Sequence, residues 1–192
     1  MRKKHVLITF AGVPFIRGGA ELMIESLKKE LTRRGFNTEI INIPFQWNPK
    51  IELIKNTVTW RTLNISEIAG QSIDLIIATK FPSYVINHPN KVTWLMHQHR
   101  AIYDLYGTPY SDFDSNSQQD LKIREQIIKI DNKTLSESKN IFTIAENTSK
   151  RLKLYNGIDS EPLYHPPKHH GRYYCEEYGD YILSVGRLEG LK

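Results

Sequence analysis

The first forty residues alternate between apolar runs and an amphipathic stretch. Residues 5–11 form a short β-branched and aromatic run, the pattern of a buried strand. In residues 20–34, apolar side chains recur at spacings of three and four, which predicts a helix. Residues 37–43 predict the next strand, which Pro44 ends. The order strand, helix, strand predicts a parallel sheet with helices on its faces.

The ends of the first predicted helix carry the expected signals. Glu21 and Glu25 lie near its start and basic residues lie near its end, so both sets of charges complement the helix dipole. Gly35 follows the helix and is expected to supply a left-handed C-terminal cap.

The same alternation continues along the chain in shorter segments. Residues 74–79 and 91–97 predict two further strands, and residues 118–136 predict a helix with one apolar face. Residues 140–145 predict another strand, followed by a helix from about residue 148 to 155. The expected fold is therefore α/β: a Rossmann-like doubly wound, mainly parallel sheet with helices on both faces.

The last thirty residues predict a change of domain. Pro166 and Pro167 suit a linker, and residues 181–185 predict a new strand. The expected organisation is an N-terminal acceptor-side domain over residues 1–160 and a linker over 161–180. Residues 181–192 would then be the first strand and loop of a second, truncated domain.

The composition is that of a folded protein. Of 192 residues, 40% are hydrophobic and 24% are charged, which excludes a disordered or collagen-like chain. The net charge of +5 allows an acidic partner, such as a phosphate or an anionic membrane surface, but equally an ordinary solvated surface. Lys and Arg residues are dispersed and form no recognised nucleic-acid motif, so nucleic acid is not an expected partner.

The sequence also indicates the cellular compartment of the protein. The single Cys175 excludes a disulfide framework within the chain and fits a reducing compartment. The basic start and the apolar residues 6–16 resemble a secretory signal, but Gly12 and Pro14 interrupt the run and an amphipathic helix follows. We therefore expect a cytoplasmic protein, with the inner face of the membrane as an alternative location.

Ligands of doubly wound sheets bind beyond the carboxyl ends of the strands, and four such places carry glycine or polar residues. The first is the pair Gly18 and Gly19, directly before the first helix. Glycines there let backbone N–H groups approach an anion or a sugar, although the pair is also compatible with a mere tight turn. The glycine spacing matches neither the dinucleotide-binding fingerprint nor the P-loop.

The second place holds His97 and His99, which would share one face of an extended chain. A metal site would need further ligands at a suitable spacing, and none stands out, so no metal is expected. A histidine at a strand end can instead bind a sugar hydroxyl or transfer a proton, while an ordinary structural histidine is the alternative.

The third and fourth places follow the last two predicted strands. Asn147, Thr148 or Ser149 would cap the next helix, and Asn147 is also a candidate substrate-binding residue. Arg187 and Lys192 follow the strand over residues 181–185 and offer cationic donors for phosphate oxygens.

Taken together, these places resemble the family-4 retaining glycosyltransferases of the GT-B fold. The similarity extends over essentially the whole chain, in the segments Arg17-Gly18-Gly19-Ala20-Glu21, His97-Gln98-His99-Arg100, Tyr103-Asp104-Leu105, Gly107-Thr108-Pro109-Tyr110, Tyr164-His165-Pro166-Pro167 and Ser184-Val185-Gly186-Arg187-Leu188. The resemblance implies two Rossmann-like domains that face a cleft. The acceptor would bind mainly to the N-terminal domain and the nucleotide-sugar mainly to the C-terminal domain.

The resemblance also implies roles for individual residues. The Gly18-Gly19 pair would lie beside the donor diphosphate and the acceptor. His97 would lie near the donor sugar, with His99 as the competing candidate because the His-x-His stretch leaves the register open. Arg187 and Lys192 match the pair that binds the diphosphate leaving group, whose growing charge fixed cations stabilise. No metal or other cofactor is implied.

The implied partners are a nucleotide-sugar donor and a glycan or lipid-linked acceptor, with peripheral membrane contact as a further suggestion. The motif that holds the donor's ribose and sugar in this family does not occur here, so the 192-residue chain is expected to need a C-terminal domain and to be inactive alone. The alternative function is a non-catalytic Rossmann-like module that binds a phosphorylated small molecule.

Overall fold

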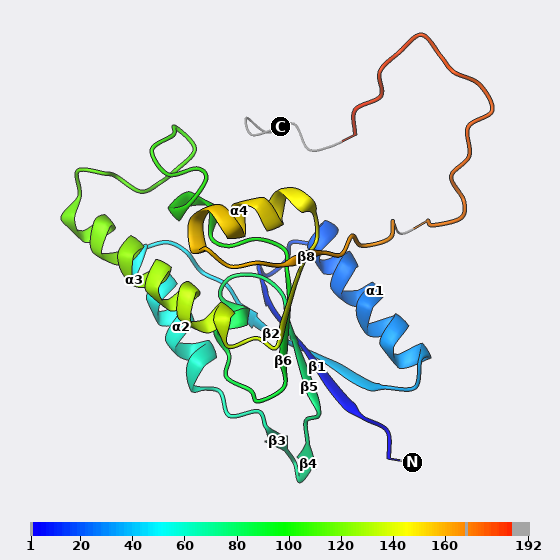
Figure 1. Ribbon diagram of the computed structural model, residues 1–192, viewed down its shortest axis with the longest axis horizontal. Helices are drawn as coiled ribbons and strands as arrows, with labels where there is room; N and C mark the ends of the chain where they lie inside the picture. Colours follow the sequence, from blue (N-terminus) through cyan, green and yellow to red (C-terminus); the bar gives the residue numbers. More distant parts are fainter. Residues whose placement is uncertain (1, 168, 186–192) are drawn as a thin grey trace.

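A six-stranded parallel sheet forms the centre of the molecule (Figure 1). The computed structural model describes residues 2–167 and 169–185. The strand order is β2-β1-β5-β6-β7-β8, and every neighbouring pair is parallel. The strands are β1 (His5–Gly12), β2 (Asn37–Pro44), β5 (Leu75–Ala78), β6 (Lys91–Leu95), β7 (Asn140–Thr143) and β8 (Glu161–Pro162). A separate antiparallel hairpin joins β3 (Glu67–Ile68) to β4 (Gln71–Ser72).

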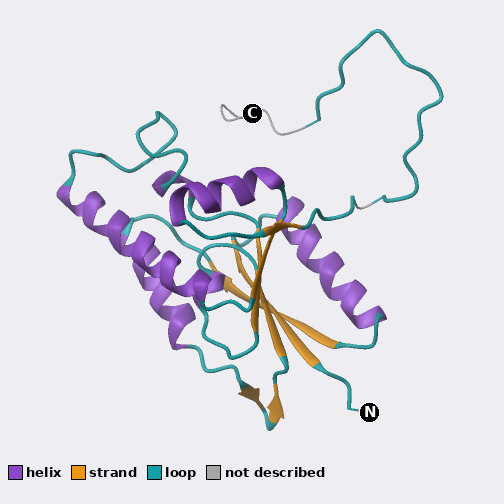
Figure 2. Cartoon of the chain, in the orientation of Figure 1, coloured by secondary structure: helices purple, strands orange, loops and turns teal. Residues whose placement is uncertain are grey.

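Helices cover both faces of this sheet (Figure 2). Helix α1 (Gly19–Arg33) lies on one face, and α2 (Ile51–Thr62) and α3 (Gln118–Ser136) lie together on the other. Helix α4 (Glu146–Asn156) connects β7 to β8, and two 3-10 turns, η1 (Ser83–Val85) and η2 (Arg100–Ile102), lie beyond β5 and β6. The predicted Rossmann-like doubly wound sheet is confirmed.

The direction of winding reverses at β1. Helix α1 carries the chain from β1 to β2 on one side, and the chain then returns through α2 and the hairpin to β5 on the other side of β1. The carboxyl ends of β1 and β5 therefore form the switch point of the sheet. Doubly wound sheets generally bind their ligands at such a point.

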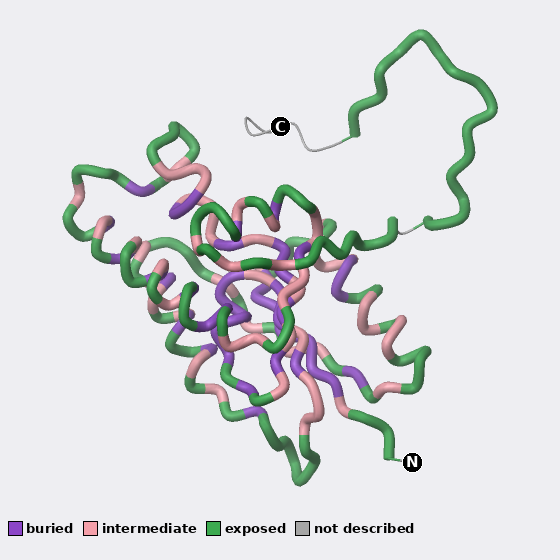
Figure 3. The backbone as a smooth tube through the Cα atoms, viewed as in Figure 1, coloured by how far each residue is buried: buried purple, intermediate pink, exposed green. Residues whose placement is uncertain are grey.

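The two sides of β1 pack into two separate apolar clusters. Leu7 and Ala11 face the larger cluster, which α2, α3 and η1 cover. Ile8 and Phe10 face the smaller cluster beneath α1. Figure 3 shows the buried residues concentrated along the strands between these layers. All four side chains are buried, so β1 is apolar on both faces, as its sequence predicts.

The predicted elements differ from the structure mainly at their ends. The strand expected over residues 91–97 ends at Leu95, and the helix expected from about residue 148 begins at Glu146. Gly35 follows α1 with a φ of 90°, which confirms the predicted left-handed cap. Helix α2 and the β3–β4 hairpin were not predicted.

Directly after β8, Leu163 still bonds to the sheet: its N–H donates to the Thr143 carbonyl at 2.7 Å, and its carbonyl accepts from Trp94 Nε1 at 2.9 Å. β8 itself pairs with β7, so the sheet extends into the region predicted as a linker. None of the described residues after Pro162 lies in a helix or strand, and the strand predicted over residues 181–185 is not formed. Ile182 and Leu183 are 98% and 75% exposed. The division into domains stays a prediction.

Candidate functional site

The loops that follow β5 and β6 remain hydrogen-bonded beyond the ends of their strands. The Met96 N–H donates to the Thr79 carbonyl at 3.0 Å, and the Phe81 N–H donates to the His97 carbonyl at 3.3 Å. These bonds fix the backbone around Lys80 and His97 at neighbouring positions on the carboxyl edge of the sheet. The loop after β1, which ends in the two glycines, borders the same edge.

Gly18 and Gly19 form the start of α1. Gly18 is the N-cap residue, and its N–H donates to Glu21 Oε2 at 2.8 Å. A Cβ placed on Gly19 would meet nothing within 4 Å, so a ligand can approach the backbone there. The first N–H groups of a helix have no partner within it and carry its positive dipole end. The predicted position of both glycines at a helix N-terminus is therefore confirmed, while their binding role stays a prediction.

His97 is neutral near pH 7 and has a defined tautomer. Its Nδ1 lies 2.8 Å from the Gln98 carbonyl oxygen, and because a carbonyl can only accept, Nδ1 carries the proton. Burial lowers the pKa of His97, and the positive charges of Lys80, Arg151 and Arg100 lower it further, against the hydrogen bond to Gln98. Nε2 is therefore unprotonated, and it can accept a hydrogen bond or a proton from a ligand hydroxyl.

His99 lies in a different environment. Its ring packs against Phe45, Phe81 and Phe113, with centroids 6.2, 5.6 and 6.4 Å away. Nε2 is buried and has no hydrogen-bond partner among the described residues, and burial lowers the pKa of His99 to about 4. β6 ends at Leu95 and His99 is the N-cap residue of the η2 turn, so the two histidines lie in the loop after the strand. That they share one face stays a prediction.

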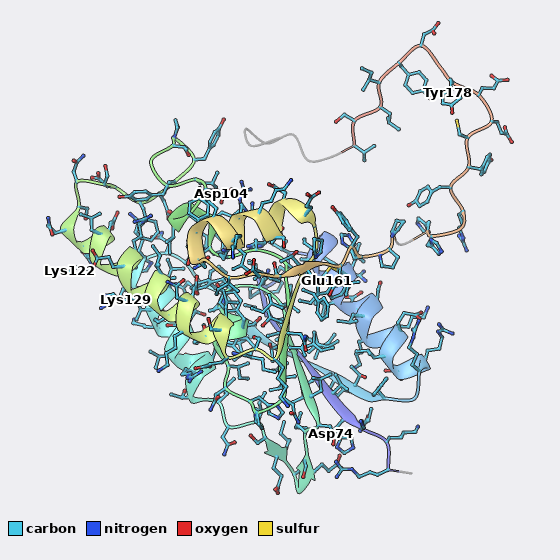
Figure 4. The ribbon with its side chains drawn as sticks, viewed as in Figure 1. Asp74, Asp104, Lys122, Lys129, Glu161 and Tyr178 are labelled. Carbon is cyan, nitrogen blue, oxygen red and sulfur yellow. The ribbon has the colours of Figure 1, made fainter. Side chains whose placement is uncertain are left out.

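A salt bridge beside the histidines joins the loop after β6 to α4. Asp104 accepts from Arg100 at 2.6 Å and from Arg151 at 3.3 Å. Partial burial raises the pKa of Asp104, but the hydrogen bond from Arg100 and the charges of both arginines lower it more. Asp104 is therefore ionised and lies near α4 at the carboxyl end of the sheet (Figure 4). The two arginines and one aspartate leave this edge with an excess of positive charge.

Lys80 lies at the same carboxyl edge and is a candidate site residue that was not predicted from the sequence. It is the second residue after β5, and its Nζ lies 4.4 Å from the centroid of the Phe10 ring. Burial lowers the pKa of Lys80, and the charge of Glu21 partly opposes this effect. The signal was present in the sequence, because Lys80 directly follows the apolar run predicted as a strand and so had to lie at the carboxyl edge.

The residues at the start of α4 do not cap it. Ala145 is the N-cap residue, so Asn147, Thr148 and Ser149 lie inside the first turn, and the expectation that one of them caps the helix is wrong. Ser149 Oγ instead bonds to Ser160, while Asn147 is exposed at the helix start. Asn147 as a substrate-binding residue stays a prediction.

The remaining points concern the predicted diphosphate-binding pair, a metal site and a membrane-spanning helix. Arg187 and Lys192 both lie outside them, so the predicted diphosphate pair has no structural account here. Within residues 2–167 and 169–185, no group of three or more His, Cys, Asp or Glu side chains could hold a metal ion. The helices of this same part of the chain are all too short or too polar to cross a bilayer.

Comparison with protein-family models finds no match, and comparison with curated proteins finds no significant match. The resemblance to retaining glycosyltransferases therefore stays a prediction from the motifs, and the structure adds to it only the fold and the positions of the residues.

Proposed function

We propose that this chain is the N-terminal, acceptor-side domain of a retaining glycosyltransferase that uses a nucleotide-diphospho-sugar. The observation that carries the proposal is the meeting of three groups at the carboxyl ends of β1, β5 and β6. These are the glycine start of α1, the Lys80 ammonium and the unprotonated Nε2 of His97. The motif resemblance supports the same function.

Each group has a role that its chemistry suits. The N–H groups at the start of α1 would approach the donor diphosphate or the acceptor, since they present partial positive charge. His97 Nε2 would accept a hydrogen bond from a hydroxyl of the donor sugar and so orient it. Arg187 and Lys192 would belong to a second domain and would stabilise the departing diphosphate.

In the proposed reaction, the bond between the sugar's anomeric carbon and the diphosphate oxygen breaks. The acceptor oxygen forms its new bond to that carbon on the same face, through an oxocarbenium-like state. The acceptor proton leaves with the diphosphate. The cationic groups of the site supply the charge stabilisation that a metal ion supplies in other phosphate sites, so no metal or other cofactor is proposed.

The acceptor is proposed to be a glycan or a lipid-linked sugar, with the protein at the cytoplasmic face of a membrane. Phe15 is fully exposed and Ile16 is 56% exposed in the loop directly before Gly18, so apolar side chains lie on the surface beside the candidate site. A lipid-linked acceptor would cover that surface, whereas a free polar sugar would not.

Saturation-transfer NMR with a panel of UDP- and GDP-sugars tests the proposal on the chain itself. We expect weak binding of one donor class, with transfer to the sugar protons, and weaker transfer in the His97→Ala variant. Lys129→Met is the matched control, because Lys129 is exposed on α3, outside the site. Absence of saturation transfer to every donor would contradict the proposed function. Tight binding that His97→Ala leaves unchanged would contradict its division between two domains.

A further inference from the structure

The position of the Lys80 side chain follows from the residues beside it. Thr79 Oγ1 donates to the Thr9 carbonyl at 2.7 Å, which joins the residue before Lys80 to β1. Phe10 belongs to the smaller apolar cluster beneath α1, and the Lys80 Nζ lies 4.4 Å from the centroid of its ring. The Lys80 ammonium therefore lies on the α1 side of β1. It is held at the carboxyl ends of β1 and β5 and does not extend freely into solvent.

The Lys80 ammonium is partly buried, and within the part of the chain that the structure describes it has no ion-pair partner. No carboxylate among the described residues lies within salt-bridge distance of it. The charge of Glu21 opposes the effect of burial on the pKa of Lys80, but the Glu21 carboxylate accepts a hydrogen bond from the Gly18 N–H. Partial burial of a charge is unfavourable unless it is paired, and the contact with the Phe10 ring offsets only part of the cost.

The groups around Lys80 favour an anion. The start of α1 presents its positive dipole end, and the Gly19 backbone is open to approach. The charges of Arg100 and Arg151 exceed that of Asp104, which binds both. His97 is neutral and adds no negative charge. A phosphoryl group suits these surroundings, because its oxygens accept from an ammonium and from backbone N–H groups at the same time.

We propose that Lys80 is an anion-binding residue whose ammonium donates hydrogen bonds to the phosphoryl oxygens of a ligand at the carboxyl ends of β1 and β5. This inference rests on the proposed function in one respect, since that phosphoryl group is taken to be the donor diphosphate. It places a diphosphate-binding cation on the N-terminal domain, in addition to the predicted pair Arg187 and Lys192.

Competitive amine labelling with trace acetic anhydride tests Lys80 without any assay of activity. Inorganic pyrophosphate is the probe, and peptide mass spectrometry measures acetylation at each lysine. We expect pyrophosphate to lower the labelling of Lys80 several-fold and to leave Lys129 unchanged. Equal labelling of Lys80 with and without pyrophosphate, or equal protection of both lysines, would overturn the inference.

Variants measure the contribution of the charge to affinity. Lys80→Met should weaken pyrophosphate binding about tenfold or more, because it removes a charge-assisted hydrogen bond. Lys80→Arg should retain most of the affinity, Glu21→Gln should raise it by removing a nearby negative charge, and Lys129→Met should not change it. Far-UV circular dichroism confirms that each variant is folded, and equal affinities of wild type and Lys80→Met would contradict the role.

Two further ligands separate this inference from the proposed function. If pyrophosphate and glucose 1-phosphate protect Lys80 but no nucleotide-sugar binds, the anion site stands and the glycosyltransferase proposal fails. If a nucleotide-sugar binds while Lys80 remains fully labelled, the glycosyltransferase proposal stands and the role of Lys80 is wrong.

Discussion

His97 and His99 lie two positions apart in the sequence, but their surroundings give the two side chains different chemistry. His97 Nδ1 contacts the Gln98 carbonyl, and its other ring nitrogen has no partner among the described residues. The His99 ring is surrounded by three aromatic side chains. The first histidine can therefore act on a ligand, and the second contributes mainly to packing.

Alanine substitutions of the two histidines should have different effects. His99→Ala should lower the free energy of unfolding by about 1–3 kcal/mol, because it leaves a cavity among aromatic rings. His97→Ala should change the free energy of unfolding by less, and it should reduce the saturation transfer to the nucleotide-sugar. Urea unfolding and saturation-transfer NMR measure the two effects, and the opposite ranking would contradict the assignment.

Asp131 is a buried carboxyl group beneath the site. Tyr103 donates its hydroxyl to Asp131 Oδ2 at 2.6 Å, and Asn156 donates to the Tyr103 oxygen at 3.3 Å. Burial raises the pKa of Asp131 to about 7, against the hydrogen bond from Tyr103. The neutral form is therefore the one that the fold favours.

Asp131→Asn should change the dependence of stability on pH. The folded pKa of Asp131 lies above the unfolded value of about 4, so its contribution is fully present below about pH 4 and is lost as pH rises to about 7. Asn cannot ionise and keeps an acceptor for Tyr103. The difference in unfolding free energy, wild type minus variant, should fall by up to about 1.4 kcal/mol per pH unit in this window.

Urea unfolding at several pH values measures this difference. His99, whose folded pKa is lowered to about 4, acts in the opposite direction in both proteins, since its contribution is present above about pH 6.5 and is lost as pH falls toward 4. It therefore cancels in the comparison. If the difference in unfolding free energy does not vary with pH, the pKa of Asp131 is not raised in the folded protein.

At the scale of elements, Lys91 joins three parts of the fold. Its side chain is fully buried, and Nζ donates to the carbonyls of Tyr84, Ile86 and Thr134 at 3.0, 3.1 and 2.7 Å. Burial lowers the pKa of Lys91 to about 8, with Glu137 acting in the opposite direction. One ammonium thus holds the η1 turn and the end of α3 against β6.

Lys91→Met should destabilise the fold by about 3 kcal/mol or more, because three buried carbonyl groups lose their donor. Lys129→Met, an exposed change on α3, should alter the free energy of unfolding by less than about 0.5 kcal/mol. Urea unfolding compares the two, and similar midpoints would show that Lys91 does not hold these elements together.

Elements were predictable where burial follows local periodicity. Helix α1 repeats its apolar residues on one face, so its sequence alone indicates a helix. Helix α2 does not, because the polar Thr57 is buried while Val58 is 55% exposed. Its position depends on packing against α3 and η1, which no local pattern records.

At the scale of the whole molecule, the segment after β8 differs from the rest. Its described residues lie outside helices and strands and expose apolar side chains, with Tyr178 at 98% and Ile182 at 98%. Tyr178 lies far from the sheet in Figure 4. The residues that form the sheet and its helices do not depend on this segment for their core.

Brief chymotrypsin digestion should therefore cut first after Tyr173, Tyr174, Tyr178 or Tyr181, where the chain is exposed and unpaired. The remaining fragment should unfold at the same urea concentration as the intact chain. Mass spectrometry identifies the cuts, with the fully buried Trp60 and Tyr84 as internal controls. Early cleavage inside α3, or a lower midpoint for the fragment, would contradict this separation.

The sequence by itself determined the parallel α/β sheet, the first helix with its glycine ends and the edge at which ligands would bind. These features follow from periodicity and chain punctuation, which are local. Only the tertiary structure decided that Lys80 faces Phe10, that His97 is available and that His99 is packed among aromatic rings. Burial and charge at those positions come from residues distant in sequence, so no local pattern contains them.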